Sequence, residues 1–333
     1  MANKVFLLTA VIAILLCISL ASFVKSKNKN QSATQTSPML QADPTIFYHQ
    51  GTYYLYGTSS DDGFLVYQSK DLKSWSGPVG KQKGYALLKR DAFGDKGFWA
   101  PQVFTYKNKF YMAYTANEQI AVAQSDSPLG PFKQNSIKPI TSTGKQIDPY
   151  IFFDSNGKPY LYYVKLQEGN RIFVSAMDTE LRDIIPGTAK ECLSATARWE
   201  NTESRSWPVA EGPTVFKIGK YYFMMYSAND YRSKDYAVGY ATALSPTGPW
   251  NKFEGNPIIS RTTVNQNGTG HGDLFKDEAG RCHYVMHTHF SDTKVSPRKT
   301  GLIDLTISEQ NNAPAILKTD GASFKFLNVS VKP

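Results

Sequence analysis

The fold is decided by one stretch, which reads Ala42-Asp43-Pro44-Thr45-Ile46-Phe47-Tyr48 and continues as Gly51-Thr52-Tyr53-Tyr54-Leu55-Tyr56. A carboxylate stands directly before a proline at its beginning. An apolar segment follows, and a short polar turn then leads into a second segment rich in tyrosine. Because aromatic and β-branched residues on both sides of a turn favour strands, the stretch predicts two adjacent β-strands.

The same pattern recurs four more times along the chain. The later copies begin at Ala100-Pro101, Asp148-Pro149, Glu211-Gly212-Pro213 and His271-Gly272. A repeat of roughly 40 to 60 residues that holds several short strands is typical of a β-propeller, in which each copy forms one four-stranded sheet. The sequence therefore predicts an all-β protein, a five-bladed β-propeller in a single domain.

The beginnings of the five copies carry the candidate chemistry. In a propeller the first strand of each blade lies nearest the central channel, so residues at these starts converge around the axis. Three starts carry a carboxylate, Asp43, Asp148 and Glu211, and a fourth carries His271. One Asp-Pro pair is a common turn starter, but repetition at one blade position indicates function. Ala100 shows that the fold does not need a charge there.

Three converging carboxyl groups suit the hydrolysis of a glycosidic bond. One carboxyl group protonates the leaving oxygen, and a second attacks or activates water. A third carboxylate near the acid raises the pKa of that acid by like-charge repulsion. We therefore expect Asp43, Asp148 and Glu211 to form a catalytic triad.

The motifs resemble those of glycoside hydrolase family 43 in order and spacing, over about residues 40–308. The resemblance rests on Ala42-Asp43-Pro44, Trp99-Ala100-Pro101, Ile147-Asp148-Pro149, Glu211-Gly212-Pro213 and Gly270-His271-Gly272. It implies a five-bladed propeller that hydrolyses arabinose- or xylose-containing polysaccharides with inversion at the anomeric carbon. No cofactor is required for this chemistry.

The resemblance also implies roles for individual residues. Asp43 corresponds to the general base that activates water, and Glu211 to the general acid. Asp148 corresponds to the residue that tunes the pKa of the acid and orients the sugar. His271 matches a channel histidine that holds either a hydrated calcium ion or an ordered water in several members of the family.

Three further residues are candidates for binding the sugar. Arg298 stands where the family often has a sugar-binding arginine, with an ordinary exposed arginine as the competing interpretation. Trp99 and Phe64 either stack on the sugar ring or pack at the edge of a blade. His283, His287 and His289 alternate along one segment but do not form a recognisable metal-binding set.

The N-terminal segment predicts export. Residues 1–22 combine Lys4 with a nearly continuous apolar run, as in a signal peptide. An uncleaved membrane anchor and lipidation at Cys17 remain alternatives. We expect residues 23–39 to form a polar linker and residues 40–333 to form the propeller of a secreted or periplasmic protein. Cys192 and Cys282 are expected to stay unpaired.

The net charge of the chain and its distribution limit the classes of molecule that we expect it to bind. The formal charge is +9, yet Lys and Arg are dispersed without a run of five or six, so nucleic acid is not an expected partner. Weak attraction to an acidic polymer and a merely soluble basic surface both fit. We expect a monomer whose partner is an arabinan- or arabinoxylan-type carbohydrate.

The leading hypothesis for the activity is an α-L-arabinofuranosidase. A β-xylosidase or an endo-arabinanase of the same family, and a catalytically silent carbohydrate-binding propeller, are the alternatives. Two segments have two readings each. The insert 190–209 either walls the pocket or caps a blade, and the strand-like piece 323–331 closes or buttresses the ring.

Overall fold

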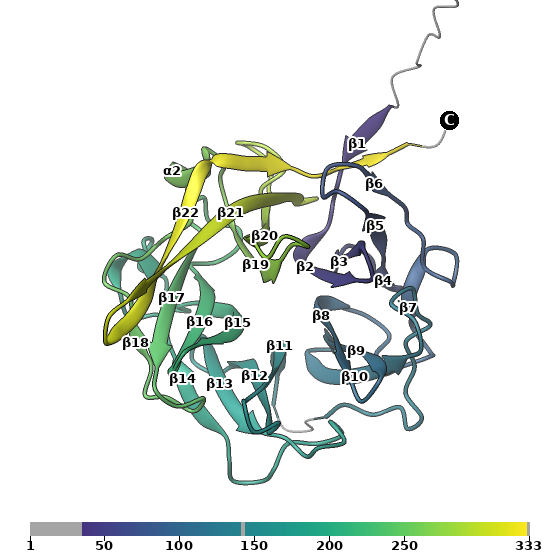
Figure 1. The fold of residues 1–333 in the computed structure, drawn as a ribbon, viewed down its shortest axis with the longest axis horizontal. Helices are drawn as coiled ribbons and strands as arrows, with labels where there is room; N and C mark the ends of the chain where they lie inside the picture. The colour runs from purple at the N-terminus through teal and green to yellow at the C-terminus, as the bar shows by residue number, and fades with distance from the viewer. Residues whose placement is uncertain (1–34, 141–143, 332–333) are drawn as a thin grey trace, which may run out of the picture. The chain divides into compact units, whose positions relative to one another are not determined.

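The computed structural model describes residues 35–140 and 144–331 of the chain. Five sheets surround a central channel, and each presents its first strand to that channel (Figure 1). These inner strands contact one another in sequence order, and the fifth contacts the first, which closes the ring. The inner strands are β2 (Ala42–His49), β8 (Trp99–Tyr106), β11 (Gln146–Phe153), β15 (Ala210–Ile218) and β19 (Gly270–Lys276). The predicted five-bladed propeller is confirmed.

Blades three, four and five have the expected four antiparallel strands each. Their connections bear two short helical elements, η1 (Arg198–Glu200) and α2 (Arg261–Val264). After its inner strand, blade three continues with β12 (Pro159–Leu166), β13 (Asn170–Ala176) and β14 (Lys190–Leu193). Blade four continues with β16 (Tyr221–Ala228), β17 (Ala237–Ala243) and β18 (Asn251–Lys252). Blade five continues with β20 (Cys282–Thr288), β21 (Lys299–Gln310) and β22 (Ala313–Phe326).

Blades one and two depart from this pattern. In blade two the sheet is β8, β9 and β10, and its outer position is reduced to a single bridge between Gln124 and Lys133. Blade one carries a separate two-stranded sheet, in which β4, between the second and third strands of the blade, pairs antiparallel with β7, which follows β6. The strands are β3 (Thr52–Thr58), β4 (Gly63–Leu65), β5 (Tyr67–Ser69), β6 (Trp75–Ser76), β7 (Tyr85–Leu88), β9 (Lys109–Ala116) and β10 (Gln119–Ser125).

The core is divided among the five junctions between neighbouring blades. On β16, Met224 packs with residues of blade three, whereas Met225 packs with residues of blade five. Successive side chains of a strand point to opposite faces, so a blade buried on both faces needs apolar residues at nearly every position. This requirement explains why the second strands read as continuous apolar and aromatic runs rather than as alternating ones.

Both ends of the described chain complete blade one. The C-terminal strand β23 (Asn328–Ser330) pairs in parallel with β6, and β1 (Thr36–Pro38) pairs antiparallel with β23 (Figure 1). Leu327, just before β23, is buried in the junction with blade five. The piece 323–331, expected as one strand that closes or buttresses the ring, is therefore divided between the end of β22 in blade five and β23 in blade one, and it connects these two blades.

The predicted start of the propeller at residue 40 is too late. β1 lies within the residues assigned to a polar linker, and Met39 is buried against the same core. Thr36, Ser37 and Pro38 offer no apolar pattern because main-chain pairing with β23 holds this edge strand. The predicted signal peptide, Cys17 and the rest of the linker lie outside the described residues.

Two smaller expectations concern membranes and thiols. No helix in the described ranges is long and apolar enough to cross a membrane. Cys192 and Cys282 are free, as predicted, and each is partly buried.

Candidate active site

The start of every inner strand has the same backbone irregularity. Each inner strand slips in register against its second strand at this point, as a β-bulge does. A bulge redirects side chains, and here it turns them toward the channel. One residue of each bulge has a left-handed backbone: Asp43 (φ 47°), Ala100 (φ 45°), Asp148 (φ 56°), Gly212 (φ 60°) and His271 (φ 40°). For the non-glycine residues this conformation costs about 1–3 kcal/mol each, which the surrounding ring must sustain.

Glu211 does not occupy the position that Asp43 and Asp148 occupy. Gly212 has the left-handed backbone in blade four, and Glu211 precedes the bulge, where it pairs with Ser227. A Cβ atom on residue 212 would lie 2.9 Å from the His271 ring. Glycine therefore leaves room for the histidine. The prediction of one shared blade position is corrected by one residue for the acid.

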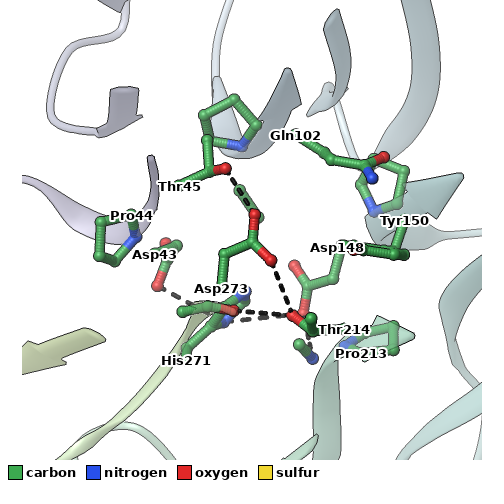
Figure 2. Close-up of a pocket in the computed structure, with 15 residues that line it drawn as sticks. Asp43, Pro44, Thr45, Gln102, Asp148, Tyr150, Pro213, Thr214, His271 and Asp273 are labelled. Atoms are coloured by element: carbon green, nitrogen blue, oxygen red, sulfur yellow. Dashed lines mark hydrogen bonds and ion pairs between the residues drawn. The ribbon is translucent and has the colours of Figure 1, made fainter. Parts of the chain in front are cut away.

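Asp43 is held as a carboxylate by positive and polar neighbours. Arg298 donates from Nη1 to Asp43 Oδ1 at 2.8 Å, and His271 Nδ1 lies 3.5 Å from the same oxygen (Figure 2). The Asp43 main-chain N–H donates to His287 Nδ1 at 3.2 Å. Burial alone would raise the pKa of Asp43, but Arg298, His271 and His287 outweigh burial and hold that pKa well below its usual value.

Asp148 is a buried carboxyl group that retains a proton more readily than Asp43 does. It accepts a hydrogen bond from the Gly212 main-chain N–H at 3.2 Å and lies 3.9 Å from His271 Nδ1. Burial raises the pKa of Asp148 to about 7, with Glu211 and Asp43 adding to the rise and His271 opposing it. Like-charge repulsion therefore acts on Asp148 itself, as a smaller contribution than burial.

Glu211 is bound at both oxygens. Tyr236 donates its hydroxyl to Oε1, and Asn170 donates its amide to Oε2, both at 2.7 Å. Burial raises the pKa of Glu211, while His271 and the two hydrogen bonds oppose it and Asp43 adds to it. The pKa lies above its ordinary value. Glu211 and Asp148 therefore keep a proton to higher pH than ordinary carboxyl groups, whereas Asp43 loses its proton at lower pH.

The residues around the channel do not fit direct binding of calcium. Ca²⁺ takes six to eight oxygen ligands, whereas the imidazole of His271 faces Asp43 and Asp148. No group of three or more His, Cys, Asp or Glu residues in the described part of the chain is arranged to hold a metal ion. The channel cavity of about 30 Å³ has room for about two waters. Calcium at His271 stays a prediction, and no step below depends on it.

The other candidate binding residues have separate outcomes. Arg298 lies at the site, where it contacts Asp43 and covers the ring of Tyr231 at 4.7 Å. Trp99 is 36% exposed at the start of β8, next to the channel residue Ala100, so stacking on a sugar stays a prediction. Phe64 has no exposed surface and packs edge-on against Phe98 and Tyr114. The prediction that Phe64 stacks on a sugar is wrong.

The three alternating histidines go to three different places. His287 is fully buried beside Asp43 and stacks on Tyr236. His283 bonds Asp277, and His289 bonds the main-chain oxygen of Tyr231. Burial and Arg298 lower the pKa of His287 to about 3, so its ring is neutral. This histidine, unassigned from the sequence, therefore holds Asp43 in place by accepting a hydrogen bond from its main chain.

Converging carboxyl groups with opposite pKa shifts at the mouth of a propeller channel define a glycoside hydrolase. Comparison with known proteins agrees and specifies the family. Residues 36–312 match the profile of Glycosyl hydrolases family 43, and the chain belongs to this family, whose members hydrolyse glycosidic bonds with inversion.

Individual relatives share only about a quarter of their residues with this chain, and their activities differ from one another. The chain is 23% identical over 330 residues to a β-D-galactofuranosidase of Aspergillus niger, covering 86% of this chain and 89% of that protein. It is 26% identical to an extracellular endo-α-(1→5)-L-arabinanase of Bacillus subtilis, covering 74% of this chain and 64% of that protein.

Solved structures are similar over nearly the whole propeller. An endo-1,4-β-xylanase structure from Bacteroides thetaiotaomicron has a TM-score of 0.82 and 37% identity, covering 90% of this chain and all of that one. A thermostable family-43 glycoside hydrolase has a TM-score of 0.75 and 38% identity, covering 84% and 93%.

Proposed function

We propose that this protein is an inverting α-L-arabinofuranosidase that removes terminal arabinose from arabinose-containing plant polysaccharides. One observation carries the proposal: Asp43 has a lowered pKa and Glu211 a raised one at the same buried site. Two carboxyl groups whose environments separate their pKa values are suited to act as base and acid.

In the proposed reaction each proton has a named donor and a named acceptor. A water molecule forms a bond from its oxygen to the anomeric carbon and gives a proton to the Asp43 carboxylate. The bond from that carbon to the leaving oxygen breaks, and this oxygen takes the proton of Glu211. Solvent later returns the proton from Asp43 to Glu211. Asp148, beside both groups, keeps the charge of the site balanced.

Burial of the carboxyl groups supports action on a terminal sugar. Asp43 and Glu211 are each 8% exposed and Asp148 is 5% exposed. To bring an internal sugar of a polymer to these buried groups, the sugars on both sides of it would also have to fit at the site. A terminal sugar has only one neighbour and can enter end-on. Relatives that act on arabinofuranose, including an α-L-arabinofuranosidase of Bacteroides ovatus at 26% identity, support arabinose, although the chain covers only 44% of that protein's length.

A β-xylan-degrading activity is the second candidate. The observation in its favour is the 37% identity to a structure that carries the name endo-1,4-β-xylanase. A terminal β-xylose and a terminal α-L-arabinofuranose present similar hydroxyl groups, so one site can accept either.

A substrate panel separates these functions. We expect kcat/KM to be at least about tenfold higher for 4-nitrophenyl α-L-arabinofuranoside than for the β-D-xyloside, and branched arabinan to yield free arabinose. The reverse preference would identify a β-xylosidase, and oligosaccharides from debranched arabinan would identify an endo-arabinanase. If no substrate is cleaved but arabinan is retained in affinity electrophoresis, the protein is a carbohydrate-binding propeller.

Export would bring such an enzyme to its polymer. The pattern of residues 1–22 and the extracellular arabinanases among the relatives support a secreted or periplasmic location, with attachment through the N-terminal segment as the alternative. We propose that the enzyme acts as a monomer.

Replacing Arg298 with methionine should shift the acid limb of the pH profile upward. Arg298 is the strongest of the groups that lower the pKa of Asp43, so its loss lets burial raise that pKa. Asp43 would then become protonated, and inactive as a base, as the pH falls through a higher value. We expect kcat/KM at pH 5 to drop at least about tenfold further than at pH 7. A uniform loss across the profile would instead assign Arg298 to sugar binding alone.

A further inference from the structure

Trp207 is the most exposed of the tryptophans and lies four residues before the acid Glu211. It is 47% exposed, yet its indole Nε1–H is fixed by a hydrogen bond to Asn170 Oδ1 at 2.8 Å. Tryptophan combines a large apolar face with one polar group, so an indole anchored by its N–H offers a rigid, open surface. A free surface tryptophan would have no reason to be held in this way.

Asn170 connects this tryptophan directly to the acid. Its amide Nδ2 donates to Glu211 Oε2 at 2.7 Å, while its Oδ1 accepts from the indole. The two partners demand opposite ends of the amide, so they enforce one orientation. A flipped amide would place its NH₂ against the indole N–H and its oxygen against the carboxyl group.

The main chain reinforces the same contact. The Asn170 N–H donates to the Pro208 oxygen at 2.9 Å, and Asn170 forms a parallel bridge with Val209. Gly169 packs so closely that a Cβ atom there would lie 2.5 Å from the Pro208 oxygen. The end of the insert 190–209 is therefore fixed against blade three and walls the site, while β14 in the same segment forms the outer strand of that blade.

The two oxygens of Glu211 differ in access. Oε1 faces Tyr236, which is fully buried and stacks on His287. Oε2 faces Asn170, which is partly exposed. Oε2, on the side of Trp207, therefore has the partly exposed partner, whereas the partner of Oε1 is fully buried.

We propose that Trp207 is the platform for the leaving-group sugar and that Asn170 positions Glu211 Oε2 against the glycosidic oxygen. The proposal rests on the proposed glycosidase function and adds a substrate class: glycosides whose leaving group is itself a sugar. As the bond to the leaving oxygen breaks, the proton passes from Oε2 to that oxygen. The side-chain amide of Asn170 then donates to the new carboxylate, and this hydrogen bond is stronger than the one that the amide made to the protonated acid.

The test compares two kinds of leaving group. A sugar leaving group needs both the platform and the proton, whereas 2,4-dinitrophenolate departs without protonation. We expect Trp207→Ala to lower kcat/KM for α-(1→5)-L-arabinotriose at least about tenfold more than for 2,4-dinitrophenyl α-L-arabinofuranoside. Trp207→Phe keeps a ring but loses the N–H, and should fall between the parent and Trp207→Ala. Leu244→Ala, at an exposed turn on the opposite end of blade four, is the matched control.

Asn170→Ala gives an independent readout that a structural role would not produce. Removing a hydrogen bond that lowers the pKa of Glu211 should move the alkaline limb of the profile to higher pH and lower kcat more than it changes KM. Equal losses on both leaving groups, with an unmoved pH profile, would overturn the proposal.

Failure of the proposed function is distinguishable from failure of this inference. The same ratio is measured with xylotriose and the dinitrophenyl β-D-xyloside, so a parent that prefers xylosides still tests the platform. If the parent cleaves no pentoside, the intrinsic fluorescence of Asp43→Asn titrated with each trisaccharide is compared with that of Asp43→Asn combined with Trp207→Phe. A response that persists without Trp207, or no response in either protein, overturns the platform.

Discussion

Replacing Asp43 with asparagine is expected to lower kcat about 10³- to 10⁴-fold, the upper part of the range for loss of a general base. An amide cannot take the proton from the attacking water. Because inversion needs that water whatever departs, the loss should be the same for arabinotriose and for the dinitrophenyl glycoside. Steady-state kinetics on both substrates check it, with thermal melting to show that the variant is folded.

Asp273 provides the matched control for this substitution. It is another carboxyl group of the channel, two residues after His271, and it accepts hydrogen bonds from Thr45 at 2.7 Å and Thr214 at 3.4 Å (Figure 2). Asp273→Asn makes the same chemical change away from the reacting atoms and should keep kcat within about threefold. If Asp43→Asn kept a comparable rate, the base would have to be another residue.

The fold was predictable because the repeated motifs occur at positions that the packing of the blades constrains. Each inner strand needs a bulge at the channel, and the motifs from Asp43-Pro44 to His271-Gly272 mark those bulges. Each blade is buried on both faces, so the aromatic second strands are visible as runs. β1 was not predicted, because an edge strand that is held by main-chain pairing needs no apolar pattern in its sequence.

The candidate site was predictable only as far as the repeat reached. Asp43 and Asp148 have equivalent positions, but Glu211 lies one residue earlier, because residue 212 must be glycine to make room for His271. Tyr236 and Trp207 come from connections between strands, and Asn170 is the first residue of β13, so none of them lies in the repeated motif at the start of an inner strand. Phe64 shows the converse error, since an aromatic near a motif can belong wholly to a blade junction.

Electrostatics explains how similar carboxyl groups take different roles. Asp43 lies against Arg298, whereas Glu211 accepts only neutral hydrogen bonds from Tyr236 and Asn170. All are buried, so the guanidinium of Arg298, together with His271 and His287, favours ionisation of Asp43 over the others. Activity should therefore require that Asp43 has lost its proton and that Glu211, with Asp148 beside it, has kept one. Because burial raises the pKa of Glu211 above its ordinary value, kcat/KM should fall as the pH rises through that raised pKa.

Glu211→Gln should lower kcat on arabinotriose about 10³- to 10⁴-fold but cost far less, about tenfold, on the dinitrophenyl glycoside. Glutamine keeps the size and hydrogen-bonding capacity of the side chain but has no proton to give, and dinitrophenolate does not need one. This dependence on the leaving group is what separates an acid from a base, since Asp43→Asn should lose both activities equally.

The pH profile of Glu211→Gln on the dinitrophenyl substrate adds a second criterion. Without a titrating acid at position 211, the rate should no longer fall on the alkaline side, although Asp148, whose pKa burial raises to about 7, remains. A fall that persists would assign the alkaline limb to Asp148 instead. Glu200→Gln is the matched control, because Glu200 is a fully buried glutamate paired with Lys252 and bonded by Tyr226. Removing its charge leaves Lys252 without its partner, so that variant should lose thermal stability and show no selective loss on sugar leaving groups.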